Sequence, residues 1–150
     1  MSGLGAPPLF VDTGPYFARV AENAPRHERA STVFTGIREG DRRYRPLYTS
    51  TYVLDELATL LIRRSTNAHA TDAIKRIRES PAFTILHPDE DDFVAAVEQF
   101  AQYDDHEISF TDHMSAVLAN ARDIDHIFSF DPDDFRTLGF LAVPDDTEDP

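Results

Sequence analysis

The chain has 150 residues, a length that fits one domain with a single sizeable core, and its hydrophobic content of 41% is near the globular norm. It contains no cysteine, which excludes disulfides and thiolate zinc sites. Residues 1–8 lack a charged signal-peptide start, and no stretch approaches the roughly 20 apolar residues of a membrane span. We therefore expect a soluble, cytoplasmic protein.

The net charge is −13, from 27 acidic and 14 basic residues, and Lys75 is the one lysine. A surface rich in acids and poor in lysine is typical of halophilic proteins, because about 1 M salt shortens the Debye length to about 3 Å and screens self-repulsion. The alternative interpretation is that the charge opposes binding to a polyanion in ordinary salt. We favour the halophilic interpretation, so charge alone does not exclude an RNA or DNA substrate.

Short apolar runs alternate with helical patterns along the chain. In chain order, the pattern predicts a strand at residues 9–11, helices at 16–22 and 25–39, a strand at 46–49, helices at 52–64 and 67–80, a strand at 83–86, helices at 88–100 and 109–122, and strands at 127–130 and 141–143. This alternation indicates an α/β protein with a mainly parallel central sheet covered on both faces. Residues 144–150 are predicted to form a loose acidic tail.

Four acidic residues stand where an apolar strand or helix meets a turn: Asp12, Glu56, Asp112 and Asp131. Asp12 and Asp131 each follow a predicted strand directly, and ligands of parallel sheets bind beyond the carboxyl ends of the strands. A carboxylate cluster binds a hard divalent cation through oxygen, and Mg²⁺ or Mn²⁺ held in that way favours phosphate chemistry. We therefore predict that the four carboxylates converge in one metal-binding pocket.

Each of these acids also has a simpler structural interpretation. Asp12 can cap the helix that follows it, and Asp131 forms a frequent turn pair with Pro132. Glu56 lies at the edge of the apolar arc of its helix, where a carboxylate is either a solvated edge residue or a site residue. Asp112 is in the first turn of its helix, where the dipole favours a solvated acid. The metal-site hypothesis depends on a fold that gathers all four.

The densest basic run is Arg42-Arg43-Tyr44-Arg45, in a predicted loop. It could contact RNA phosphates and stack a base, although a solvated loop is the simpler interpretation. The six histidines show no His-x-x-x-His spacing, so we expect most of them at the surface. The chain also lacks a Gly-rich phosphate loop and a Gly-x-Ser-x-Gly motif.

The four acids belong to four short motifs, which are Leu9-Phe10-Val11-Asp12-Thr13, Thr49-Ser50-x-x-Val53-x-x-Glu56, Ser109-Phe110-Thr111-Asp112 and Ile127-Phe128-Ser129-Phe130-Asp131. Their order and spacing, over residues 9–143, resemble the PIN-domain family and in particular the toxin ribonucleases of VapBC toxin–antitoxin pairs. Phe135 and Gly139 fit the same pattern. The segment from Asp131 to Phe135 is one residue longer than the family pattern, so Asp133 or Asp134 could supply or share the fourth acidic position.

The resemblance implies a three-layer α/β/α PIN-like fold for residues 1–150, with a core at about residues 9–143 and an acidic tail at 144–150. It implies an Mg²⁺- or Mn²⁺-dependent endoribonuclease, the toxin of a type II pair, that cleaves tRNA or ribosomal RNA. Its partners would be a cognate antitoxin and a second copy of the chain in a homodimer. Asp12 and Asp112 would be the central ligands, completed by Glu56 and Asp131. The auxiliary residues that would orient water or substrate are Thr13 and Ser129.

Two alternatives come from other functional classes. The first is a catalytically silent PIN-fold protein that binds RNA or a partner. The second is a metal-dependent phosphatase or phosphotransfer domain, which we rank last because the chain has no Gly-rich phosphate loop. The first two predicted helices carry more apolar residues than one sheet face needs, and this surplus could pair subunits or receive an antitoxin segment. The residues concerned are Phe17, Val20, Val33, Phe34 and Ile37.

Overall fold

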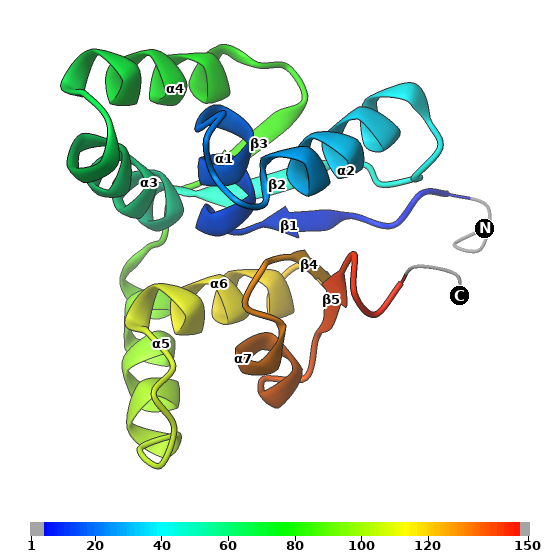
Figure 1. Ribbon diagram of the computed structural model, residues 1–150. Coiled ribbons are helices and arrows are strands. Elements are labelled where there is room, and N and C mark those ends of the chain that lie inside the picture. Colours follow the sequence, from blue (N-terminus) through cyan, green and yellow to red (C-terminus); the bar gives the residue numbers. More distant parts are fainter. Residues whose placement is uncertain (1–4, 148–150) are drawn as a thin grey trace.

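The computed structural model describes residues 5–147 and contains a five-stranded sheet flanked by helices (Figure 1). The strands are β1 (Leu9–Val11), β2 (Leu47–Ser50), β3 (Phe83–Leu86), β4 (His126–Phe128) and β5 (Leu141–Val143). The helices are α1 (Thr13–Val20), α2 (His27–Glu39), α3 (Thr51–Arg64), α4 (Asn67–Glu79), α5 (Glu90–Gln102), α6 (Phe110–Asn120) and α7 (Pro132–Thr137).

The sheet has the strand order β3-β2-β1-β4-β5, and all neighbouring strands are parallel. The chain moves outward from β1 to β2 and β3, then crosses back to β4 on the other side of β1. Helices α1 to α4 cover one face of the sheet and α5 to α7 the other, as right-handed crossovers require (Figure 1). The predicted three-layer α/β/α fold is confirmed. The strand order reverses between β1 and β4, which is where ligands bind in open α/β sheets.

The centre of the sheet is buried on both faces. All three residues of β1 have no exposed surface, and Ile127 and Phe128 of β4 are equally buried. Phe10 pairs with Tyr48 of β2 on one side and with Ile127 on the other. Continuous apolar strands of this kind are typical of parallel sheets covered by helices, and they hold the ends of β1 and β4 in fixed positions.

Strand and helix join without a loop at two places near the carboxyl edge of the sheet. Strand β2 runs directly into α3, and the Ser50 side chain caps that helix by accepting from the Val53 N–H. Strand β1 is separated from α1 by Asp12 alone, and Pro15 fits inside the first turn of α1, where its missing N–H costs no hydrogen bond. These short junctions fix the direction of the side chains that follow the strands.

Three sequence expectations differ from the structure. Helix α7 was not predicted, because Asp131-Pro132 was interpreted as a turn, whereas Pro132 occupies the first helical position, which its fixed φ favours. His113 is fully buried, whereas most of the histidines were expected at the surface; its Nδ1 lies 2.8 Å from Gln99 Nε2. In the predicted loose tail, Asp146 is tied down by Arg136 and by the Ala142 N–H, while residues 148–150 lie outside the described residues.

Candidate functional site

A cavity of about 400 Å³ opens at the carboxyl ends of β1 and β4, where the strand order reverses. The structure places all four acids of the sequence motifs in its lining. Its walls come from α1, α3, α6, α7 and the segment before α6. The lining residues are Asp12, Thr13, Gly14, Glu56, Leu60, Glu107, Ser109, Asp112, Phe130, Asp131 and Asp134.

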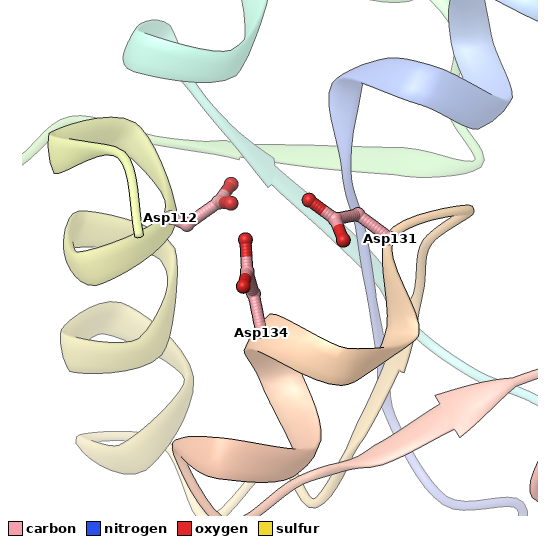
Figure 2. Close-up of side chains that lie close together, drawn as sticks. All are labelled: Asp112, Asp131 and Asp134. Carbon is pink, nitrogen blue, oxygen red and sulfur yellow. The ribbon is translucent and has the colours of Figure 1, made fainter. Parts of the chain in front are cut away.

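Three of these carboxylates lie especially close together. One oxygen each from Asp112, Asp131 and Asp134 lies within 4.8 Å of the other two. Figure 2 shows the three side chains directed into the same space, from α6, from the turn after β4 and from α7. Asp112 is buried, Asp134 is half-buried and Asp131 is exposed, so the cluster reaches from the interior to the mouth of the cavity.

Asp12 lies at the floor of the cavity, at the end of β1. Its Oδ2 accepts a hydrogen bond of 3.1 Å from Ser129 Oγ, and the same hydroxyl accepts one of 2.9 Å from the Asp131 N–H. Ser129 therefore links the acids that follow β1 and β4. Asp12 Oδ1 and Thr13 Oγ1 are buried and have no hydrogen-bond partner among residues 5–147. Buried polar atoms without a partner are costly, which makes these oxygens candidate ligands of a cation or of ordered water.

Because the acids are buried and close together, ionisation of their carboxyl groups is unfavourable. Burial raises the pKa of Asp12 to about 6, and the charge of Glu56 adds to this. Burial also raises the pKa of Asp112 to about 8, with further contributions from the charges of Asp12 and Glu56. Burial and a hydrogen bond with Asp131 raise the pKa of Asp134 to about 6. A bound cation would stabilise the ionised forms of all three.

The residues present fit a hard divalent cation. The set offers carboxylate oxygens and hydroxyls, with no sulfur, and Mg²⁺ and Mn²⁺ prefer such oxygen ligands. One oxygen of the buried Asp12 lacks a hydrogen-bond partner and is free to coordinate. The residues that could hold a metal are Asp12, Glu56, Asp112, Asp131 and Asp134.

The two acids that follow Pro132 point in different directions. Asp134 joins Asp112 and Asp131 in the cavity, whereas the Asp133 side chain is 91% exposed and forms an ion pair of 3.1 Å with Arg136. The fully buried Phe135 fixes α7 in this rotation. Of the two acids left open by the motif, the structure thus brings only Asp134 to the cluster.

The basic run lies at the other edge of the sheet. Residues 42–45 precede β2, and in a parallel sheet the amino ends of the strands lie opposite the carboxyl ends, where the cavity opens. Tyr44 Oη lies 2.8 Å from His126 Nδ1, and the Arg45 N–H donates to the Pro7 carbonyl. The structure does not bring this run together with the carboxylates, and its contact with RNA stays a prediction.

Sequence reasoning missed further residues in and beside the cavity, and three of them are polar or aromatic groups near the carboxylates. Glu107 and Phe130 line it, and Arg26 donates to the Phe130 carbonyl oxygen at 2.7 Å. Glu107 lies in an acidic loop, Asp104 to Glu107, whose position relative to the sheet no local pattern indicates. Arg26 stands 104 positions before its partner. The tertiary fold alone brings these groups together.

Comparison with known proteins supports the same family. The PIN domain family matches residues 9–141. The chain is 30% identical over 135 residues to the 23S rRNA-specific endonuclease VapC20 of Mycobacterium tuberculosis (strain ATCC 25618 / H37Rv), a match that spans 90% of this chain and 97% of the relative. The crystal structure of Mycobacterium tuberculosis VapC20, described as a sarcin-ricin loop cleaving toxin, matches with a TM-score of 0.79 over 89% of this chain and 96% of that chain.

A more distant structure shares the fold. VapBC2 from Rickettsia felis, bound to a DNA fragment from its promoter, has a TM-score of 0.64 at 11% identity, covering 89% of this chain and 96% of that chain. The region matched by the PIN family, residues 9–141, contains the first four strands and all four acidic motifs. The chain therefore belongs to the PIN domain family, as its motifs predict.

Proposed function

We propose that this chain is a metal-dependent endoribonuclease and the toxin of a type II toxin–antitoxin pair. The observation that carries the proposal is the convergence of the candidate ligands from four separate segments in one cavity, at the reversal point of the sheet; these ligands are Asp12, Glu56, Asp112, Asp131 and Asp134. The 30% identity to an rRNA endonuclease over 90% of the chain supports it. A bound Mg²⁺ or Mn²⁺ would lower the pKa of water and neutralise charge on the scissile phosphate.

The residues divide into ligands and supporting groups. Asp12 and Asp112, both buried, are the central ligands, and Asp131 and Asp134 complete the set at the mouth. Glu56 faces them from α3. Two hydroxyls support these acids: Ser129, which holds Asp12 by a hydrogen bond, and Thr13, whose free Oγ1 is available to orient water or substrate.

Ribosomal RNA is the substrate class to test first. The relative with 30% identity is specific for 23S rRNA, and its structure is described as that of a toxin that cleaves the sarcin-ricin loop. A tRNA remains the second class in our proposal. We place the activity in the cytoplasm, where both RNAs occur; within residues 5–147, no helix is both long and apolar enough to cross a membrane.

The test of this function is Asp12→Asn. The isosteric amide removes a charged ligand but relieves repulsion in the empty cavity, so the variant should be as stable as the parent without metal and inactive with it. We expect cleavage of a labelled rRNA fragment in Mg²⁺ or Mn²⁺ to fall at least a hundredfold, roughly the loss of a key catalytic group. Asp55→Asn, on the exposed face of α3, is the matched control and should cleave normally.

The main alternative is a PIN-fold protein that binds RNA or a partner without turnover. A parent protein that binds RNA but shows no cleavage in either metal would establish that alternative. Cleavage by Asp12→Asn at the parental rate would instead reject the proposed site while leaving the enzyme class intact.

The antitoxin has a suitable groove on the other side of α1. A cavity of about 1200 Å³ runs between α1, α2 and α4. Phe34, Ile37 and Phe83 supply its apolar surface, and Arg19 and Arg38 supply positive charge. We propose that an antitoxin segment with apolar and acidic side chains binds there, which is one of the two roles predicted for the apolar residues of the first two helices.

The second copy of the chain has a different candidate surface. The apolar side chains of α1 and α2 are partly or fully buried against the core, and Val20, Phe34 and Ile37 line the groove proposed for the antitoxin. On α5, by contrast, only Ala96 is buried, and four apolar side chains are 43 to 48% exposed. They are Phe93, Val94, Val97 and Phe100.

We propose that a homodimer forms through antiparallel packing of two α5 helices. The three acids in the first turn of α5, residues 90–92, would then lie beside the carboxyl-terminal half of the partner's α5, which has fewer acids. In a parallel arrangement they would lie beside the same three acids of the partner. Val97→Asp should convert the dimer to a monomer in light scattering at micromolar protein and high salt. A monomeric parent under those conditions would refute the dimer.

A further inference from the structure

Arg26, in the connection between α1 and α2, lies against the rim of the acidic cavity. Its Nη1 donates to the Phe130 carbonyl oxygen at 2.7 Å, and its Cζ lies 5.1 Å from the centroid of the Phe130 ring. Phe130 itself lines the cavity and packs over Gly14 at the start of α1. The arginine is exposed, so its guanidinium is held beside the site and remains open to solvent.

The cavity beside this arginine is lined by acidic side chains. The acids in the cavity lining are Asp12, Glu56, Glu107, Asp112, Asp131 and Asp134, and among residues 5–147 no lysine or arginine lines it. An RNA strand brings phosphates on both sides of the scissile bond, and these would face an acidic wall. A metal bound at the centre would neutralise charge on the scissile phosphate, and a cation at the rim would do the same for a neighbouring phosphate.

The geometry leaves Arg26 free to supply that cation. Within residues 5–147, its guanidinium forms no ion pair with a carboxylate, and its one hydrogen bond uses one of five N–H donors. The bond to the Phe130 carbonyl and the ring beneath the guanidinium fix the side chain, which lowers the entropy lost on binding. Arginine pairs with phosphate through two parallel N–H···O bonds.

We propose that Arg26 binds an RNA phosphate adjacent to the scissile one, and that Phe130 positions it. This inference rests on the proposed ribonuclease function. The competing explanation is that Arg26 only ties the α1–α2 connection to the segment after β4. A purely structural arginine would not change the salt dependence of RNA binding, whereas a phosphate contact contributes about 0.7 to 0.9 to the slope of log affinity against log salt.

The experiment compares Arg26→Ala and Arg26→Lys with Arg78→Ala, which removes an exposed arginine on the far side of α4. The probe is a labelled RNA hairpin with the sarcin-ricin loop sequence. Its affinity is measured in EDTA between 50 and 500 mM KCl, roughly the range in which counterion release is resolved, and its cleavage is measured in Mn²⁺. We expect Arg26→Ala to weaken binding and raise KM about tenfold with kcat little changed, and to reduce the salt slope by about 0.7 to 0.9. Arg26→Lys should recover part of the affinity, because it retains the charge but loses the planar fork.

Mn²⁺ binding measured by calorimetry should be the same in Arg26→Ala and the parent, which shows that the acidic site is intact. Equal affinity and equal salt slope in Arg26→Ala and the parent would overturn the inference, as would an equal loss in Arg78→Ala or a parent that binds no RNA. A parent that binds the hairpin but does not cleave it in metal would reject the proposed function and leave the Arg26 contact to be decided by the binding data.

Discussion

Two acidic groups lie on either side of α7, and their electrostatics differ. On one side, Asp134 lies with Asp131 and Asp112, has no basic partner in the cluster, and has a raised pKa because of burial. On the other side, Asp146 accepts three hydrogen bonds from Arg136, the shortest of 2.6 Å, and these lower its pKa. Asp133, next to Asp134 in sequence, belongs to this second group.

The difference shows that a cluster of carboxylates indicates a candidate site only when the carboxylates lack basic partners. The Arg136 group is a neutralised, exposed cluster that holds the segment after β5 against α7. In the cavity group, no carboxylate forms an ion pair with a lysine or arginine within residues 5–147, so the negative charges repel one another and favour a bound cation. Proteins tolerate such unpaired clusters chiefly at functional sites.

Asp134→Asn and Asp133→Asn test the comparison most sharply, because the two residues are neighbours with opposite surroundings. We expect Asp134→Asn to reduce Mn²⁺ affinity and RNA cleavage about tenfold to a hundredfold, as for other losses of a ligand or its support. Asp133→Asn should leave both within about twofold, because exposed pairs contribute little. Calorimetric titration with Mn²⁺ and a cleavage assay measure these effects. The reverse order of losses would place the fourth acid at Asp133.

The pH dependence of stability tests the unpaired group directly. The pKa of Asp112 is about 8 in the folded chain and near 3.8 in the unfolded chain. Unfolding therefore releases a proton between these values, and the free energy of unfolding should fall as pH rises from about 4 to 8 without metal. Asp112→Asn cannot ionise, so it should show a shallower fall and be more stable than the parent by about 2 kcal/mol at pH 8.

Urea denaturation in EDTA at pH 5 and pH 8 measures this difference. Asp55→Asn, on the exposed face of α3, controls for the loss of one negative charge and should keep the parental pH dependence. If the free energy of unfolding fell with pH as steeply in Asp112→Asn as in the parent, ionisation of Asp112 would not be the cause of the fall. Added Mn²⁺ should abolish the fall in the parent, because the cation favours the ionised acids.

Sequence alone was sufficient for much of the fold and for the position of Asp12. A run of three apolar residues ending in an acid predicts the end of a buried strand, and parallel topology then places that acid at the ligand edge. The same reasoning, applied to the amino end of β2, could have placed Arg42 to Arg45 at the opposite edge. The signal was available, since the run immediately precedes a predicted strand.

Other features of the site could not be predicted from local sequence patterns. The choice between Asp133 and Asp134 depends on the rotation of a six-residue helix, in which successive side chains differ by about 100°. That rotation is set by burial of Phe135, which no periodicity in so short a helix reveals. The contact of Arg26 with Phe130 is likewise tertiary, because it joins a connecting segment to residues after the fourth strand.

Added salt should weaken the stabilisation from the paired acids and strengthen that of the unpaired acids. Because the net charge is −13, we expect the second effect on stability to be larger. Screening weakens the Arg136 ion pairs but relieves repulsion among the far more numerous acids. We expect the melting temperature to rise as KCl increases from low to molar concentration, as the halophilic interpretation predicts. Scanning calorimetry in EDTA measures it. A flat or falling melting temperature would remove that interpretation and restore the charge objection to an RNA substrate.

Arg136→Ala should have the smallest effect, since it breaks the paired group without touching the cavity. Asp146 has a lowered pKa when folded, so its pairing stabilises the fold above the unfolded value near 3.8, and this contribution is lost as pH falls through the folded pKa. The melting temperature of Arg136→Ala should therefore lie a few degrees at most below the parent at neutral pH, and the difference should vanish in acid. Arg76→Ala removes a more exposed pair with Asp72 and is the control, with a still smaller shift expected. If Arg136→Ala instead abolished Mn²⁺ binding, the two acidic groups would have to act as one, and the contrast drawn between them would fail.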